Sequence, residues 1–139
     1  MELTYNPPIV AIDFDETIAT NGYPDIKNAK LLPYAKKGIE KIQEAGWRTV
    51  LWTCRENQYL IDAIEFLREN EIFLDAHNEN ILTNREYEEL GYVDSRKIGA
   101  DVYIDDRNIN GDINWEKIAE KLINIYDIND KQMSLWESD

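Results

Sequence analysis

A short apolar run that ends in acidic residues constrains this chain more than any other stretch of its sequence. Residues 9–17 read I-V-A-I-D-F-D-E-T, so a run of apolar residues is followed by Asp13, Asp15 and Thr17. A continuous apolar run rich in β-branched residues is typical of a strand buried on both faces of a parallel sheet. Open α/β sheets bind their ligands at the carboxyl ends of such strands. The sequence therefore predicts an acidic pair at this edge, with a metal ion, a lysine or both nearby to balance its charge.

Further strands and helices alternate along the chain. The apolar patterns predict strands at 48–53, 72–74 and 98–105, and helices at about 32–45, 58–70 and 115–126. Gly46 is expected to end the first helix, and Asn57 is expected to cap the second. This alternation predicts an α/β fold of three layers, Rossmann-like, with a central parallel sheet and helices on both faces.

The length of the chain and of its inserts predicts a single domain. A chain of 139 residues is the size of one domain, with a core at about 8–126 and an acidic, loosely packed tail at 127–139. We expect residues 17–30, which are polar and rich in turn signals, to form an irregular flap. Residues 77–97 form a second insert, with one short helix near 85–90. Because neither insert is long enough for a separate domain, we expect no cap domain over the sheet.

The charge of the chain limits its classes of partner, and its cysteine content and apolar runs indicate its location. The 15 basic and 28 acidic residues give a net charge of −13, which argues against nucleic acid as a long polyanionic partner, although a nucleic-acid end stays open. A small phosphate ester could still bind where a metal ion and a few cations gather. The single cysteine, Cys54, excludes a disulfide within the chain. With no signal-peptide pattern and no apolar run near the ~20 residues of a membrane span, we expect a cytoplasmic protein without a membrane partner.

Polar and charged residues end three of the predicted strands and precede the last one. They are Asp13 with Asp15, Thr53, Asp105 with Asp106, and Lys97. A carboxylate can act as a nucleophile and form an acyl phosphate. Mg²⁺ offsets the repulsion between that carboxylate and a phosphate, and a second carboxylate can move the proton. The set therefore predicts phosphoryl transfer at this edge of the sheet.

These residues resemble the four motifs of the haloacid dehalogenase superfamily of phosphohydrolases. The matching residues are Asp13-Phe14-Asp15-Glu16-Thr17, Thr53, Lys97 and Asp105-Asp106, in the order of the family's motifs. The resemblance extends from residue 9 to about residue 106, and thus over most of the chain. It implies a haloacid dehalogenase-like core like that of the small capless members.

The resemblance also implies roles for the acidic residues. Asp13 would be the nucleophile and a ligand of Mg²⁺. Asp15 would be the general acid/base, with its backbone carbonyl also on the metal. Asp105 would bind Mg²⁺. Asp106 would bind Mg²⁺ directly or through a water molecule, or it would instead hold Lys97 in place.

Three further residues are expected to contact the substrate. The resemblance implies that the Thr53 hydroxyl binds a phosphate oxygen, and that Lys97 neutralises the phosphate and orients Asp13. Motif position alone favours Lys97 over its neighbour Arg96. Arg55 follows the threonine motif, so it could clamp a substrate phosphate or carboxylate, or it could pair with one of the many acids.

Glu16 departs from the family pattern, which usually has glycine after the second aspartate. Glycine adopts these backbone angles freely, whereas glutamate adopts them only at a cost in free energy. We therefore expect the turn to differ slightly from that of the family, and the direction of the Asp15 side chain to differ with it. His77 follows the third predicted strand and Arg107 follows the second acidic pair. Each of the two either faces the site or lies on the surface.

The sequence thus predicts a Mg²⁺-dependent phosphatase that hydrolyses a small phosphomonoester through an aspartyl phosphate. The two inserts, or a second copy of the chain, would cover the open site. A phosphotransferase, which differs only in the final acceptor, is one alternative. A receiver-like signalling module and a phosphate-binding protein without turnover are others. A receiver has adjacent acids after its first strand, whereas this chain has D-x-D, and a long-lived phosphorylated Asp13 would identify a receiver.

Overall fold

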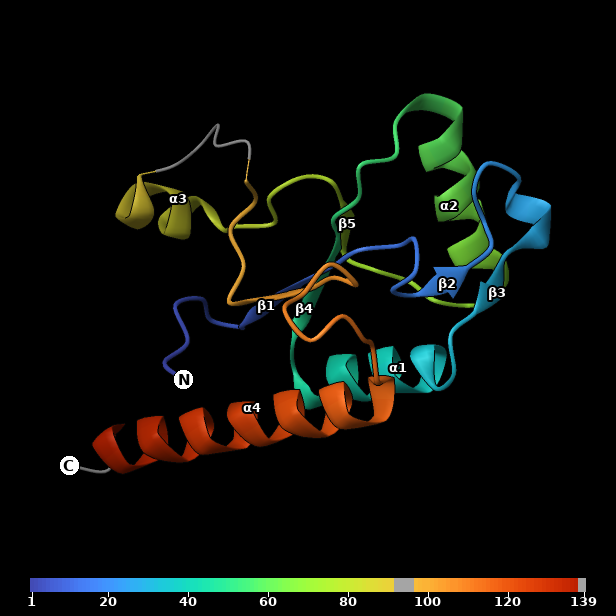
Figure 1. Cartoon of the computed structure of the whole chain (residues 1–139). Helices are drawn as coiled ribbons and strands as arrows, with labels where there is room; N and C mark the ends of the chain where they lie inside the picture. Colours follow the sequence, from blue (N-terminus) through green and yellow to red (C-terminus); the bar gives the residue numbers. More distant parts are fainter. Residues whose placement is uncertain (92–96, 138–139) are drawn as a thin grey trace.

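A parallel sheet of four strands lies at the centre of the protein, as Figure 1 shows for the computed structural model, which describes residues 1–91 and 97–137. The strands are β1 (Ile9–Ile12), β4 (Arg48–Leu51), β5 (Ala76–His77) and β6 (Val102–Ile104), in the order β5-β4-β1-β6. The helices are α1 (Ala35–Ala45), α2 (Asn57–Glu69), α3 (Asn84–Leu90) and α4 (Trp115–Glu137). The predicted α/β, Rossmann-like architecture is confirmed.

Strand β1 lies between β4 and β6 and aligns their carboxyl ends. Ile12 is the register partner of both Leu51 in β4 and Ile104 in β6. The pairing continues one residue further, since the Asp13 N–H donates to the Ile104 carbonyl at 2.9 Å and the Trp52 N–H donates to the Ile12 carbonyl at 2.8 Å. The residues that follow these three strands therefore start from the same level of the sheet.

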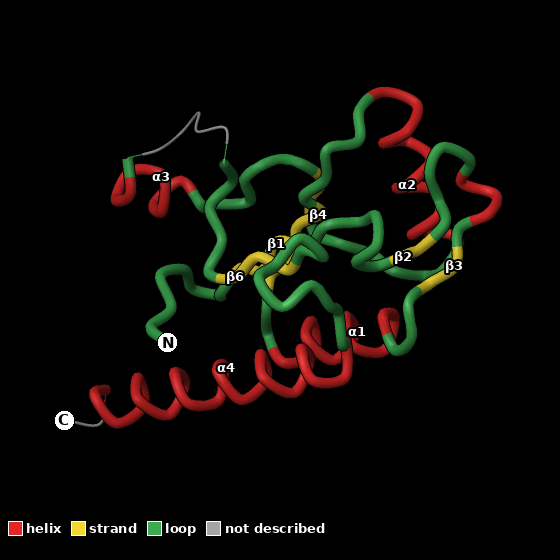
Figure 2. Tube along the Cα trace, in the orientation of Figure 1, coloured by secondary structure: helices red, strands yellow, loops and turns green. Residues whose placement is uncertain are grey.

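The two faces of the sheet contribute to separate apolar cores. All four residues of β1 are buried, as expected for a central strand. Val10 and Ile12 pack into the larger core with residues of α1, α2 and α4, whereas Ile9 and Ala11 pack into a smaller core with the segment that carries α3. Alternate residues of a strand point to opposite faces, so the sheet is covered on both sides (Figure 2).

The flap at residues 17–30 is more regular than predicted. It contains β2 (Ala19–Thr20) and the 3₁₀ helix η1 (Ile26–Asn28), and β2 pairs antiparallel with β3 (Lys30–Leu31). The Leu32 N–H donates to the Ile18 carbonyl at 2.8 Å, and Ile18 is fully buried. Strands of two residues are too short to show a periodic pattern, which is why the sequence indicated only a flap.

Two helix starts differ from the prediction. Helix α1 begins at Ala35, because Tyr34 adopts a left-handed conformation (φ 65°) before it. Helix α2 begins at Asn57, which itself has a positive φ of 52°, and Glu56 takes the N-cap position instead. The predicted end of α1 is confirmed, since Gly46 follows it with a φ of 115°.

The strand predicted at 72–74 lies elsewhere. Ile72 is buried in the larger core, but Phe73 is 64% exposed and pairing with β4 begins only at Ala76. The Asp75 carboxylate accepts hydrogen bonds from the Thr49 N–H and hydroxyl. These bonds hold the chain next to β4 directly before β5 begins at Ala76. An apolar triplet alone did not show where the pairing starts.

Helix α4 extends beyond the predicted helix at 115–126. It continues through most of the expected acidic tail to Glu137 and runs alongside α1 in Figure 1. The sequence contains neither glycine nor proline after Gly111, so it contains no strong helix breaker there. Residues 138–139 of the predicted tail lie outside the described residues. Among the described helices, none is both long and apolar enough to cross a membrane.

Candidate functional site

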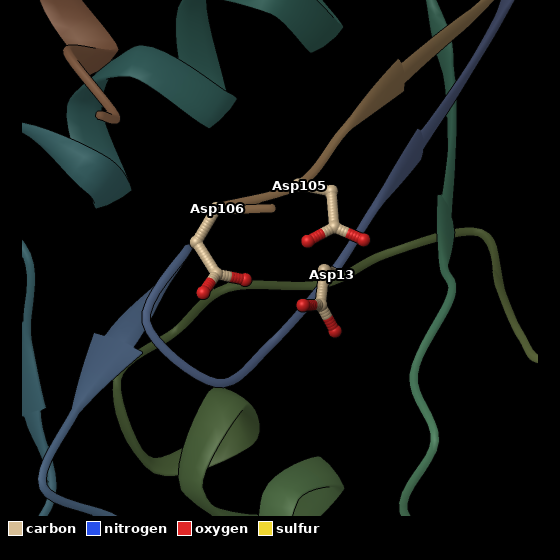
Figure 3. Close-up of side chains that lie close together, drawn as sticks. All are labelled: Asp13, Asp105 and Asp106. Atoms are coloured by element: carbon tan, nitrogen blue, oxygen red, sulfur yellow. The ribbon is translucent and has the colours of Figure 1, made fainter. Parts of the chain in front are cut away.

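Three carboxylates meet at the carboxyl ends of β1 and β6. Asp13 follows β1, whereas Asp105 and Asp106 follow β6, and one oxygen from each lies within 4.8 Å of the other two (Figure 3). All three residues are half-buried. Carboxylate oxygens are the donors that hard divalent cations prefer, so this acidic triad (Asp13, Asp105 and Asp106) could hold a metal ion. Parallel pairing of β1 with β6 has brought together the two acidic motifs of the sequence.

The acidic triad is electrostatically crowded. Burial, and to a smaller extent the charges of Asp105, Asp106 and Asp15, raise the pKa of Asp13 from 3.8 to about 7, against a hydrogen bond from the Phe14 N–H that lowers it. Burial and a hydrogen bond with Asp105 also raise the pKa of Asp106. A proton or a cation would relieve this repulsion.

Thr17 connects the two acidic loops. Its hydroxyl, which is fully buried, accepts a hydrogen bond from the Asp106 N–H at 3.0 Å, and its carbonyl accepts one from Trp115 Nε1 at 2.7 Å. The sequence showed the hydroxyl but gave it no role. No local pattern could have done so, because its partner is 89 residues away.

Asp15 lies outside the acidic triad and pairs with Arg55. Arg55 Nε donates to Asp15 Oδ2 at 2.8 Å, and Nη2 donates to Oδ1 at 2.7 Å. Of the two expectations for Arg55, pairing with an acid is the one that the structure shows. The predicted contact of Asp15 with the metal runs through its backbone carbonyl and stays a prediction.

The turn at Glu16 has the conformation that glycine adopts freely. Glu16 has a φ of 57°, and its N–H donates to the Ala19 carbonyl at 2.7 Å. Its carboxylate accepts hydrogen bonds from the Thr20 hydroxyl at 3.0 and 2.8 Å. The predicted backbone cost is therefore present, and local hydrogen bonds offset part of it.

Thr53 lies just beyond β4, at the same level of the sheet as the acidic triad. Its N–H donates to Asn78 Oδ1 at 2.8 Å, and its hydroxyl accepts from the Arg55 N–H at 3.2 Å. Asn78 was missed by the sequence analysis. Its φ of 53° is typical of asparagine in a turn, but the contact with Thr53 has no local signal. The predicted binding of phosphate by Thr53 stays a prediction.

The remaining candidate residues are Lys97, His77, Arg107 and Arg96. The Lys97 ammonium lies 4.6 Å from the centre of the Tyr103 ring, and its role toward phosphate stays a prediction. His77 is half-buried in β5, and Arg107 is exposed, with its N–H donating to Asp105 Oδ1 at 2.9 Å. Arg96 lies outside the described residues.

Comparison with known proteins finds similar chains among the solved structures. No protein-family model and no curated protein matches the chain. A solved structure of a conserved protein from Bacteroides thetaiotaomicron is 36% identical and has a TM-score of 0.67, and the match covers 81% of this chain and 86% of that one. A chain of the Pnkp1/Rnl/Hen1 RNA repair complex shares the fold, at 20% identity, a TM-score of 0.54, and coverage of 78% of this chain and 39% of that one. The chain therefore belongs to the same family as the conserved Bacteroides protein.

Proposed function

We propose that this protein is a Mg²⁺-dependent phosphohydrolase of the haloacid dehalogenase type, which hydrolyses a small phosphomonoester through an aspartyl phosphate on Asp13. The observation that carries the proposal is the acidic triad, whose oxygens lie within 4.8 Å of one another. Asp15, two residues after the nucleophile, and Thr53 at the same edge complete the resemblance to that superfamily. A location in the reducing cytoplasm would fit the single cysteine of the chain.

The donor set of the acidic triad fits a hard divalent cation. Asp13, Asp105 and Asp106 would hold Mg²⁺ through carboxylate oxygens, with water completing the coordination shell. The pKa of Asp13, raised to about 7, is consistent with a half-buried site in which several carboxylates lie close together. When bound, Mg²⁺ would neutralise the substrate phosphate and offset its repulsion from the carboxylates.

The residues of the chain would carry out the reaction in two steps. In the first, an Asp13 oxygen attacks phosphorus, the bond from phosphorus to the ester oxygen breaks, and the Asp15 carboxyl gives its proton to the leaving alcohol. In the second, water attacks the aspartyl phosphate. Asp15 takes a proton from that water, the bond from phosphorus to the Asp13 oxygen breaks, and phosphate leaves.

The direct test is phosphate release from a panel of phosphomonoesters, with Mg²⁺ or with EDTA, by the wild type and by Asp13→Ala. We expect release that requires Mg²⁺ and disappears in Asp13→Ala. The net charge of −13 favours small substrates, but the panel should include an oligonucleotide with a terminal phosphate, because one protein of similar fold belongs to an RNA repair complex.

Trapping of the intermediate separates hydrolysis from signalling. Acid quenching should capture a short-lived phosphate on Asp13 during turnover. Release that persists in Asp13→Ala would contradict the proposal. A phosphorylated Asp13 that lasts for minutes would indicate a receiver-like module instead.

A further inference from the structure

Arg55 is a buried cation that has no role in the two proposed reaction steps. The residue is 5% exposed, and it lies two residues after Thr53. A buried charge is costly unless it is paired and hydrogen-bonded. Besides its two bonds to Asp15, Arg55 donates from Nη2 to the Gly22 carbonyl at 2.9 Å and from Nη1 to the Tyr59 carbonyl at 3.0 Å.

The same guanidinium lies over two aromatic rings. Arg55 Cζ lies 4.9 Å from the ring centre of Phe14 and 5.6 Å from that of Tyr23. Tyr23 also packs against Tyr59, with the ring centres 5.1 Å apart and the ring planes tilted by 42°. Arg55 therefore joins three segments: the loop after β1, the flap, and the first turn of α2.

These contacts occupy most of the hydrogen-bonding capacity of Arg55. A guanidinium has five N–H donors, and the four bonds to Asp15, Gly22 and Tyr59 use all of them but one on Nη1. A clamp on a substrate phosphate needs two parallel N–H groups directed at the ligand. That pair of donors is directed at Asp15 instead.

We propose that Arg55 is a positioning residue, which fixes the Asp15 carboxylate for proton transfer and ties it to the flap, rather than a phosphate ligand. This inference rests on the proposed function of the site. Arg55 touches no reacting atom. It acts through Asp15, whose proton goes to the ester oxygen as the bond from that oxygen to phosphorus breaks, and which regains a proton from water when the aspartyl phosphate is hydrolysed.

The role predicts a dependence on the leaving group. A poor leaving group such as an alcohol needs the proton from Asp15, whereas p-nitrophenolate leaves without one. Arg55→Lys keeps the charge but loses the bidentate geometry. We expect kcat/KM of Arg55→Lys to fall about 100-fold for glycerol phosphate and less than about 10-fold for p-nitrophenyl phosphate. This ratio reports formation of the aspartyl phosphate, and a purely structural role would lower both rates alike.

Two variants calibrate the measurement. Asp15→Asn should show the same preference for p-nitrophenyl phosphate, and Arg55→Lys in that background should cause little further loss, because the two residues act as one unit. Arg48 provides a matched control. Its guanidinium also pairs with a carboxylate through two bonds, to Glu86 at 3.0 and 3.1 Å, but in the segment around α3. Arg48→Lys should leave the ratio of the two rates unchanged.

A second variant covers the case in which Arg55→Lys does not fold. Tyr23 is 62% exposed, so Tyr23→Ala should fold while removing one ring from Arg55. It should shift the ratio in the same direction by a smaller factor. Equal losses on both substrates, in Arg55→Lys or in Tyr23→Ala, would overturn the inference and indicate a purely structural role or a direct phosphate contact. Failure of the wild type to release phosphate from either substrate in an Asp13-dependent way would contradict the proposed function itself.

Discussion

Two residues of the loop after β1 occupy states that cost free energy. The Asp13 carboxylate lies in a half-buried group of like charges, and burial raises its pKa to about 7. Glu16 holds a φ of 57°, which costs an L-residue roughly 1 kcal/mol. Such costs persist only where the surrounding structure imposes them, and they are common at functional sites. Here the buried Thr17 hydroxyl and the Trp115 side chain hold the loop in place.

Removal of the Asp13 charge should stabilise the metal-free protein. Asp13→Asn keeps an oxygen for the hydrogen bond from the Phe14 N–H, which is 2.8 Å long, but removes the repulsion from Asp105 and Asp106. We expect the free energy of unfolding to rise by about 1 kcal/mol or more at pH 8 in EDTA, while phosphate release is lost. Urea denaturation measures the first effect. A variant less stable than the wild type under these conditions would contradict the crowding described for Asp13.

The same pair of proteins should show a defined pH dependence. The folded protein binds the Asp13 proton more tightly than the unfolded chain does, because the pKa is about 7 instead of 3.8. The wild type should therefore lose stability relative to Asp13→Asn as the pH rises from about 4 to about 7. Above that range the difference should stay constant, and below it the difference should vanish. Unfolding curves of both proteins across this range measure it.

At the scale of secondary-structure elements, the packing of α1 against α4 depends on Gly46. Gly46 ends α1 with a φ of 115°, and a Cβ there would lie 2.8 Å from the Tyr126 ring of α4. Trp47, the next residue, donates from Nε1 to the Leu122 carbonyl at 3.1 Å. The end of α1 and the contact with α4 therefore require the same absence of a side chain.

Gly46→Ala should be strongly destabilising. The backbone strain and the clash with Tyr126 should together cost about 2–3 kcal/mol, seen as a lower urea midpoint at an unchanged m-value. Gly111→Ala is the control, because Gly111 has a φ of 74° with open space around its Cβ position. It should cost about 1 kcal/mol. Equal losses in the two variants would show that contact with α4 does not matter at Gly46.

At the scale of the whole molecule, net charge and topology both make the site negative. A chain with a net charge of −13 repels an anionic ligand, and the parallel sheet concentrates three of its acids at one edge. A bound cation would reverse the local charge. The acidic triad should therefore couple the stability of the fold to a divalent ion.

Mg²⁺ should raise the melting temperature of the wild type. A ligand that binds only the folded state adds about 2.7 kcal/mol when its concentration is 100 times its Kd. The comparison should use K⁺ at matched ionic strength, since salt screens the net charge without a specific site. Asp105→Asn should lose most of the difference between Mg²⁺ and K⁺. A difference that persists in this variant would place the ion elsewhere.

Local patterns in the sequence determined the elements of this protein and the level at which the acids lie. The apolar run before Asp13 predicted a strand buried on both faces, because a central parallel strand needs apolar side chains on each side. Gly46 predicted the end of α1, since glycine adopts a positive φ at little cost. The strand-end positions of Asp13 and Asp105 then predicted that they would meet, because parallel strands end at one edge.

Only the tertiary structure decided how the side chains are paired. Arg55 pairs with Asp15, 40 residues away, although the chain has many other acids. The Thr17 hydroxyl accepts a hydrogen bond from the Asp106 N–H, 89 residues away. The start of β5 was set by pairing with β4 rather than by the apolar triplet at 72–74. Contacts of this kind join segments that are distant in the chain. Propensity and periodicity act over a few residues, so they carry no information about such partners until the sheet has brought them together.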